Sequence, residues 1–185
     1  MRVIAGSAKS LQLKTIKGLE TRPTTDRIKE TLFNMISPYL AGCRFLDLFS
    51  GSGAIGIEAL SRGADSCVFI ENNREAVQCI KENLEFTHLE AKAEILSREA
   101  KGALLSLKDV EPFSIIFMDP PYDSNLEDSL FSYLADLSLT DEESLIIVEA
   151  KLSKSFDFVK DFGFEVIKEK CYKTNKHVFL KRSIT

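Results

Sequence analysis

The sequence has no long apolar run. None of its 185 residues belongs to a stretch that approaches the roughly 18 apolar residues of a membrane-spanning helix. The opening MRVIAGSAKS lacks the apolar core of a secretory signal. The composition, 44% hydrophobic and 28% charged, is ordinary for a single folded domain. We therefore expect a cytoplasmic protein that has no membrane partner.

Side chains that could bind a metal are scarce and poorly spaced. The four cysteines never form a C-x-x-C pair, and only two histidines are present. Structural zinc sites need closely paired Cys or His ligands. We expect no metal site, and the cysteines are expected to be buried, reduced thiols that pack as small hydrophobic residues.

Positive charge is concentrated at the two ends of the chain. The formal net charge is −4, yet residues 1–30 and residues 165–185 each carry an excess of Lys and Arg over Asp and Glu. The middle of the chain is correspondingly acidic. Such an excess is compatible with an ordinary solvated surface, but two basic ends on an acidic body also suit a partner that presents phosphate groups.

From residue 44 onward, short apolar runs alternate with longer amphipathic runs. The apolar runs are predicted strands and cover residues 44–49, 66–71, 92–96, 114–119 and 144–149. The runs with apolar residues at three- and four-residue spacing are predicted helices and cover residues 54–62, 74–86, 100–107 and 126–137. Strict alternation predicts an α/β fold, doubly wound, with a parallel sheet and helices on both faces.

The two ends of the chain have different patterns. Residues 164–173 and 176–182 alternate apolar and polar residues, which predicts an antiparallel hairpin at the end of the sheet. Residues 1–40 form an extension with two short strand candidates and a helix over 24–36. Thr24 or Thr25 would cap this helix, and Pro38 would end it. We expect residues 41–185 to form the main domain.

A glycine-rich loop follows the first predicted strand. Gly51, Gly53 and Gly56 have G-x-G-x-x-G spacing and open the first helix of the main domain, and Glu71 ends the second strand. This arrangement suits a dinucleotide or S-adenosylmethionine, with Glu71 on the ribose hydroxyls. Asp47, four residues before Gly51, would repel a pyrophosphate and attract an ammonium group, which favours S-adenosylmethionine. A nicotinamide-dependent oxidoreductase, or a purely structural turn, remains an alternative.

The sequence DPPY follows the fourth strand at residues 119–122. The two prolines restrict the backbone after Asp119 and make the loop rigid where it leaves the sheet. The Asp119 carboxylate and the Pro120 carbonyl could both accept hydrogen bonds from one exocyclic NH₂ group, and Tyr122 offers a ring for stacking. The pattern therefore predicts methyl transfer to an amine of a nucleobase, which is flipped out if it lies in structured nucleic acid.

Taken together, these motifs carry a family resemblance. LDLFSGSGAIGIEALSRGA followed by DPPY resembles class I S-adenosylmethionine-dependent methyltransferases, and RPTTDRIKETLFNMI upstream is similar to the N-terminal signature of the RsmD family. The resemblance implies a Rossmann-like fold with seven strands, and transfer of a methyl group to guanine N2 of bacterial 16S rRNA. The chain departs from the family pattern at Ser10 and Leu11, where Gly and Arg are usual.

The resemblance implies a role for each matching residue. The catalytic motif corresponds to Asp119, Pro120, Pro121 and Tyr122. Contacts to the cofactor are implied for Asp47, Gly51, Ser52, Gly53, Glu71, Asn72, Glu99 and Ala100. The signature that lies over the substrate mouth corresponds to Arg22, Thr24, Thr25, Asp26 and Arg27.

The nucleic-acid partner is expected to be 16S rRNA or the small ribosomal subunit, bound by a monomer. We expect Lys173 and Lys176, in the loop of the last hairpin, to contact its phosphates. Two alternatives stay open: an adenine or cytosine amino-methyltransferase of DNA, and a non-catalytic RNA-binding factor for ribosome assembly. No block of residues is large enough for a separate DNA-reading domain, which counts against the first.

Overall fold

The computed structural model describes residues 1–16, 25–121 and 126–183. They form a seven-stranded mixed sheet with the strand order β3-β2-β1-β4-β5-β7-β6. Its strands are β1 (Arg44–Leu48), β2 (Ser66–Ile70), β3 (Ala93–Leu96), β4 (Ile115–Met118), β5 (Leu145–Lys151), β6 (Phe164–Cys171) and β7 (Asn175–Arg182). The first five strands are mutually parallel, whereas β7 runs antiparallel to both β5 and β6. The predicted doubly wound fold with a C-terminal antiparallel hairpin is confirmed.

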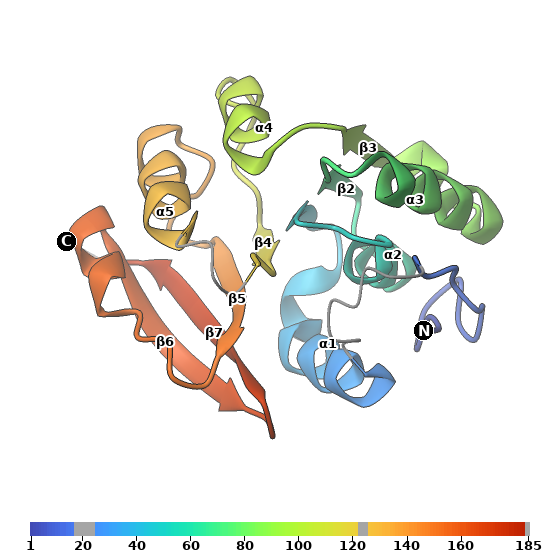
Figure 1. Cartoon of the computed structure of the whole chain (residues 1–185), viewed down its shortest axis with the longest axis horizontal. Coiled ribbons are helices and arrows are strands. Elements are labelled where there is room, and N and C mark those ends of the chain that lie inside the picture. The colour runs from blue at the N-terminus through green and yellow to red at the C-terminus, as the bar shows by residue number, and fades with distance from the viewer. Residues whose placement is uncertain (17–24, 122–125, 184–185) are drawn as a thin grey trace.

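Helices cover both faces of this sheet (Figure 1). The α-helices are α1 (Asp26–Leu40), α2 (Ala54–Ser61), α3 (Arg74–Thr87), α4 (Ala100–Ser106) and α5 (Leu126–Asp136). Two short 3₁₀ segments are η1 (Glu90–Lys92) and η2 (Asp157–Phe162). Within the described residues, no helix is both long enough and apolar enough to cross a membrane.

Alternation along the strands separates two hydrophobic cores. Phe45, Phe117 and Ile147 point to the face packed by α1, α2 and α3. Their neighbours Leu46 and Met118 point to the opposite face, which α4, α5 and η2 cover. Because buried parallel strands are apolar on both faces, they read as continuous apolar runs in the sequence. For this reason each strand predicted in the main domain is found within about two residues of its expected bounds.

Helix α1 begins as predicted but ends later. Thr25 is its N-cap, and its hydroxyl oxygen accepts a hydrogen bond from the Ile28 amide at 3.3 Å. Pro38 lies inside the helix, which continues to Leu40. The missing Pro38 N–H would have reached the carbonyl of Asn34, an exposed residue whose carbonyl water can satisfy, and the buried Leu40 side chain packs the final turn into the core.

A buried carboxylate joins the N-terminal segment to α2. Glu58 accepts hydrogen bonds from the amides of Ile4 and Ala5, at 2.9 and 3.1 Å. Its carboxylate also pairs with Lys29 of α1 at 3.0 Å and with Arg62 at 2.7 Å. A buried ion pair is tolerated only when such additional bonds satisfy the remaining lone pairs. Glu58 therefore fixes residues 2–5 and α1 against the main domain.

The expected N-terminal strands pair only briefly. Arg2 and Gln12 form an isolated antiparallel bridge, supported by backbone bonds from Val3 to Leu11 and from Leu13 to Met1. Val3 and Leu13 are buried in the same core cluster as α1, α2 and the sheet. The extension over residues 1–40 and the main domain over 41–185 thus share one hydrophobic core.

Candidate active site

The central strands of the sheet lie at a change of strand order. Strand β1 has β2 on one side and β4 on the other, so the connections after β1 and β4 leave the sheet in opposite directions. In open α/β sheets, ligands bind beyond the carboxyl ends of the strands at such a point. The glycine loop after β1 and the DPPY sequence after β4 both begin at this edge.

The glycine loop is built by left-handed backbone and close packing. Gly53 has φ 80° and is the N-cap of α2, a conformation that side chains other than glycine rarely adopt. A Cβ atom on Gly56 would lie 2.3 Å from a ring carbon of Phe69, so only glycine lets α2 approach β2 this closely. The loop is also held by Asn83 of α3, whose side-chain amide donates to the Ser52 carbonyl at 2.9 Å.

Asp47 is buried directly beneath this loop. Its carboxylate accepts a hydrogen bond from the Gly56 amide at 3.1 Å. Burial raises the pKa of Asp47 to about 7, the Gly56 hydrogen bond opposes that rise, and the nearby Glu71 adds to it. A buried carboxylate without a full ion partner favours a cation, which agrees with its predicted contact to the amino group of a methionine moiety.

Glu71 connects the glycine loop to the next helix. One carboxylate oxygen accepts from the Gly51 amide at 2.9 Å, and the other accepts from the Asn73 amide at 2.9 Å. Asn73 is in turn the N-cap of α3. The structure therefore brings together two of the residues predicted to bind the cofactor, Gly51 and Glu71, which lie twenty positions apart in the chain.

A cavity of about 300 Å³ opens beside Glu71. It collects four further predicted residues, since Asn72, Glu99, Ala100 and Pro121 line it. The rest of its lining is Phe49, Ile70, Glu71, Arg98, Lys101, Leu126 and Leu130. A mostly apolar pocket with a few polar groups suits a planar heterocycle. A second cavity of similar size lies between Gln12 and Phe86 and contains no residue of either motif.

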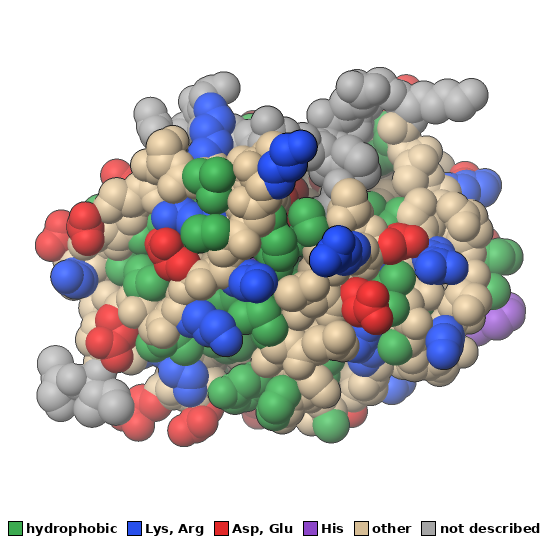
Figure 2. Space-filling view, turned by 90° about the horizontal axis from the view of Figure 1, so that it is seen from below, with side chains coloured by type: hydrophobic (Ala, Val, Ile, Leu, Met, Phe, Trp, Pro, Cys, Tyr) green, Lys and Arg blue, Asp and Glu red, His purple; other side chains and the backbone are tan. Residues whose placement is uncertain are grey.

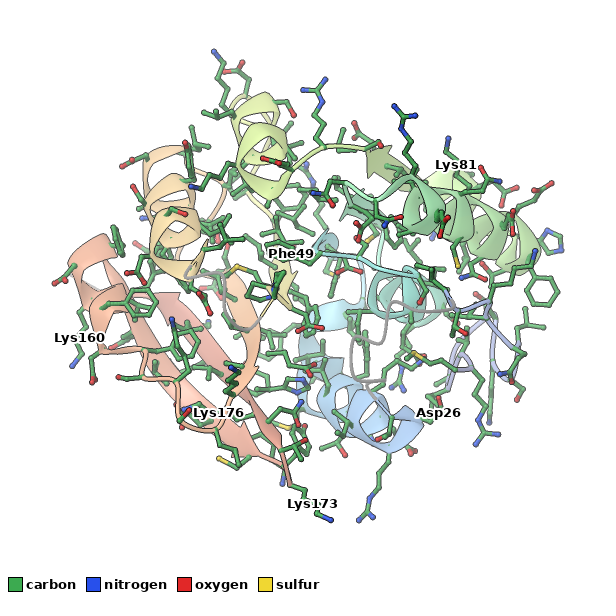
Figure 3. The ribbon with its side chains drawn as sticks, in the orientation of Figure 1. Asp26, Phe49, Lys81, Lys160, Lys173 and Lys176 are labelled. Atoms are coloured by element: carbon green, nitrogen blue, oxygen red, sulfur yellow. The ribbon has the colours of Figure 1, made fainter. Side chains whose placement is uncertain are left out.

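Phe49 is a residue of this site that the sequence motifs did not indicate. It has φ 94°, which is unusual for a bulky side chain and strained. Its amide and that of Ser50 both donate to the Ile70 carbonyl, at 3.1 and 3.0 Å, which holds this turn in place. The ring lies near the middle of the molecule in Figure 3 and lines the cavity. The sequence signal that could have indicated Phe49 is its position, as a bulky residue in the turn between the first strand and the G-x-G loop.

Asp119 lies one residue past the end of β4 and is half-buried. Burial raises its pKa to about 8, with further contributions from Glu149 and Asp47. Pro120 is buried and Pro121 is exposed beside the cavity. Tyr122 lies outside the described residues. A carboxyl group with a pKa near neutrality, at the edge of a cofactor-sized cavity, is the arrangement expected of a functional site.

The residues predicted to lie over the substrate mouth are only partly described. Thr25 caps α1, and Asp26 pairs with Arg2 at 3.1 Å, so both have structural roles. Arg27 is exposed on the first turn of the same helix. Arg22 and Thr24 lie outside the described residues.

Of the two lysines predicted to lie in the hairpin loop, Lys173 lies there and Lys176 does not. Lys173 is exposed in the turn between β6 and β7 and points away from the body of the protein (Figure 3). Lys176 belongs to β7 rather than to the loop, and it is buried. It pairs with Glu169 at 2.8 Å and lies over the ring of Phe156. The placement predicted for Lys176 is therefore wrong, because β7 lies between β5 and β6 and its first six residues are buried on both faces of the sheet.

Comparisons with known proteins agree with this geometry. Residues 1–181 match the family model described as Conserved hypothetical protein 95. The chain is 33% identical to the Ribosomal RNA small subunit methyltransferase D of Haemophilus influenzae, an alignment that covers 92% of this chain and 88% of that protein. The chain belongs to the RsmD family of methyltransferases.

Two further similar proteins, both described as methyltransferases, support the assignment. The protein YlbH of Bacillus subtilis is 43% identical over 150 residues, which are 80% of this chain and 82% of YlbH. The solved structure of the Escherichia coli protein YhhF superimposes with a TM-score of 0.86 at 31% identity, covering 100% of this chain and 99% of that one. The chain is thus an S-adenosylmethionine-dependent methyltransferase with a Rossmann-like fold.

The residues present fit this cofactor. The buried Asp47 carboxylate can hold an ammonium group, Glu71 presents its carboxylate at the end of β2, and the adjoining cavity is large enough for an adenine ring. Among the described residues, no cluster of His, Cys, Asp and Glu could hold a metal ion.

Proposed function

We propose that this chain transfers a methyl group from S-adenosylmethionine to the exocyclic N2 amine of a guanine in small-subunit (16S) rRNA. The observation that carries the proposal is the position of Asp119, at the carboxyl edge of β4 and next to the cofactor cavity. The choice of rRNA is supported by the name of the Haemophilus influenzae relative. The choice of guanine N2 rests on the RPTTDR signature in the sequence.

The cofactor would be held by residues from three strand ends. Asp47 binds the amino group of the methionine moiety, and Gly51, Ser52 and Gly53 let the backbone pass close to it. Glu71 accepts hydrogen bonds from the ribose hydroxyls, and Asn72, Glu99 and Ala100 surround the adenine. When bound, S-adenosylmethionine supplies an activated methyl group on a positively charged sulfur.

Asp119 and Pro120 would prepare the target amine. The lone pair of an exocyclic amine is delocalised into the base, which makes the nitrogen a poor nucleophile. The Asp119 carboxylate and the Pro120 carbonyl each accept one hydrogen bond from the NH₂ group and hold the lone pair toward the methyl group. Pro121 restrains this loop, and Tyr122 stacks on the flipped base.

The RNA would lie against the two basic ends of the chain. Of the signature residues expected to contact the substrate, Arg27 is exposed on the first turn of α1 and is available to bind phosphate. Lys173, exposed at the tip of the hairpin, contacts phosphate. Lys176, being buried and paired, supports the hairpin instead.

The experiment that tests the proposal compares three substrates. The purified protein is incubated with tritiated S-adenosylmethionine and with small ribosomal subunits, protein-free 16S rRNA or duplex DNA. We expect label in RNA, and nucleoside mass spectrometry should identify N2-methylguanosine. Labelled DNA would favour the alternative amino-methyltransferase of DNA. Cofactor binding without label in any substrate would favour the non-catalytic assembly factor.

A further inference from the structure

A row of buried polar residues continues from Asp119 across the sheet. Strands β4 and β5 pair in register up to Met118 and Val148, so Asp119 and Glu149 occupy the next positions of neighbouring strands. His177 of β7 stands directly opposite Glu149. One level lower on the same face, the corresponding row is apolar and consists of Phe117, Ile147 and Phe179.

Two side chains contact the Glu149 carboxylate directly, and a third reaches it through His177. The Asn175 side-chain amide donates to one oxygen at 2.6 Å, and His177 Nε2 lies 3.3 Å from the other. The second ring nitrogen of His177 lies 3.2 Å from the hydroxyl of Tyr172, which is partly exposed at the hairpin turn. Glu149, Asn175 and His177 are almost fully buried. The side-chain oxygen of Asn175 has no hydrogen-bond partner among the described residues, so the network is satisfied at Glu149 and His177 but not at every atom.

The histidine ring determines the direction of hydrogen-bond donation from Tyr172 through His177 to Glu149. When the Tyr172 hydroxyl donates to Nδ1, the proton of a neutral imidazole resides on Nε2 and points to Glu149. Glu149 then accepts from two N–H donors, those of Asn175 and His177. After burial, the charge of Glu149 is the largest cause that raises the pKa of Asp119.

The surroundings of Asp119 disfavour the ionised form of its carboxyl group. Asp119 is half-buried beside Glu149, and two neighbouring carboxyl groups cannot both ionise easily. The described groups that act on it are Glu149 from β5 and Asp47 from β1, and His177 follows behind Glu149. From α1 and α2, the charged groups Lys29 and Glu58 pair with each other. Burial and the two carboxylates together account for the pKa of about 8 at Asp119.

We propose that Tyr172, His177 and Glu149 form a positioning chain that keeps the negative charge on Glu149 and thereby keeps a proton on Asp119 until the site is filled. The chain acts through Asp119 and touches neither substrate nor cofactor. Its use in catalysis rests on the proposed function, because a protonated Asp119 accepts hydrogen bonds from an amine poorly. The positive charge of the methyl donor would draw Asp119 into its carboxylate form, so that the acceptor forms only once the donor is in place.

The ionisation of Asp119 can be measured without any substrate. Nuclear magnetic resonance of ¹³C-labelled carboxyl groups in the free protein should give a midpoint for Asp119 well above that of an ordinary aspartate. In Glu149→Gln this midpoint should fall by about one pH unit or more, since the neighbouring negative charge is gone. In Tyr172→Phe it should fall by a smaller amount, because the proton on His177 is no longer directed to Glu149.

Glu169→Gln is the matched control. It removes a carboxylate that pairs with Lys176, a residue of β7 like His177, but it does so on the opposite face of the hairpin. This variant should leave the Asp119 midpoint unchanged. An ordinary midpoint in the wild-type protein, or an unchanged midpoint in both Glu149→Gln and Tyr172→Phe, would overturn the proposal. These results are independent of whether the protein methylates rRNA.

The pH profile of turnover tests the catalytic part separately. If Asp119 must ionise, the low-pH limb of kcat should move to lower pH in Glu149→Gln and stay in place in Glu169→Gln. A lower kcat with an unchanged low-pH limb would mean that Tyr172, His177 and Glu149 have only a structural role. If the wild-type protein methylates nothing while the midpoints shift as expected, the proposed function fails and the proton assignment stands.

Discussion

The proposed role of the Asp119 side chain is to act on the target amine, and it does not line the cofactor cavity. It lies past the end of β4, and the lining of the cofactor cavity comes from other residues. We expect Asp119→Ala to lower kcat by about 10²-fold or more, as happens when an active-site hydrogen-bonding group is removed. The dissociation constant for S-adenosylmethionine, measured by calorimetry, should rise much less than kcat falls, because the lining of the cofactor cavity is unchanged and only the charge of Asp119 is lost. Near-normal turnover in this variant would contradict the role assigned to Asp119.

Ser10 shows how a single residue can carry strain. It has φ 71° in the N-terminal turn, a conformation that favours glycine, and glycine is the residue that the RsmD resemblance leads one to expect there. We expect Ser10→Gly to raise the free energy of unfolding by about 0.5 to 1 kcal/mol, measured by urea denaturation. Ser7→Gly is the control, because Ser7 does not have a positive φ and the change should be neutral or destabilising. A destabilised Ser10→Gly variant would contradict this explanation.

At the residue scale, the sequence predicted what depends on local spacing. Motif and strand order predict that Asp47, Gly51, Glu71 and Asp119 share one edge of the sheet. In the structure Glu71 bonds to the Gly51 amide, and Asp47 bonds to the Gly56 amide of the same loop. Glu149 could not be predicted in the same way, because its relation to Asp119 arises from pairing between strands that are 30 residues apart.

At the scale of elements, β6 presents its lysines on a single face. Lys168 lies opposite Phe179 and Lys170 opposite His177, so both share the face on which Asp119 lies. Lys170 is three strands from Asp119, or about 14 Å at the usual strand spacing. Figure 2 views the molecule over α1 and the hairpin, and Lys and Arg side chains are spread across this face.

We expect the double change Lys168→Glu and Lys170→Glu to weaken RNA binding and to lower its dependence on salt. Each lost phosphate contact should reduce the slope of log affinity against log salt by about 0.7 to 0.9. Filter binding of 16S rRNA at several salt concentrations measures this slope. Lys81→Glu with Lys92→Glu is the control, since Lys81 projects from α3 on the far side of the molecule (Figure 3). Equal losses in both double variants would point to a non-specific effect of charge.

Element boundaries were predictable where one physical signal dominated. The buried strand β4 is a continuous apolar run, β1 is apolar except at Arg44 and Asp47, and α3 has a clear apolar stripe. The C-terminal boundary of α1 was not predictable, because Pro38 is a local signal to end the helix and the burial of Leu40 outweighs it. The burial of Lys176 was not predictable either, because it depends on β7 lying between β5 and β6 in the sheet, which local sequence does not indicate.

For the whole molecule, the carboxyl groups of Asp47 and Asp119 predict how stability depends on pH. In the unfolded chain an aspartate loses its proton near pH 4, whereas Asp47 and Asp119 keep theirs to about pH 7 and 8 in the folded state. The folded state therefore binds more protons over this interval, so the stabilising contribution is present at low pH and is lost as the pH rises to about 8.

Asp47→Asn combined with Asp119→Asn should remove this dependence. Urea denaturation at pH 5, 6.5 and 8 should show the wild-type protein losing stability relative to the double variant as the pH rises, by up to about 1.4 kcal/mol per pH unit for each proton involved. A constant difference across this range would show that neither carboxyl group is protonated in the folded protein near neutrality.

The Glu58 carboxylate has a consequence for the order in which the chain is made. Its partners are the amides of Ile4 and Ala5, Lys29, and Arg62, so they either precede it or follow it by only four residues. During synthesis, every charge in this cluster can be neutralised once Arg62 has left the ribosome, before strands β2 to β7 are complete. The hairpin that completes the Asp119 environment begins at Phe164, 106 residues after Glu58. The ion cluster can therefore form during synthesis before the chain of residues that acts on Asp119 is complete.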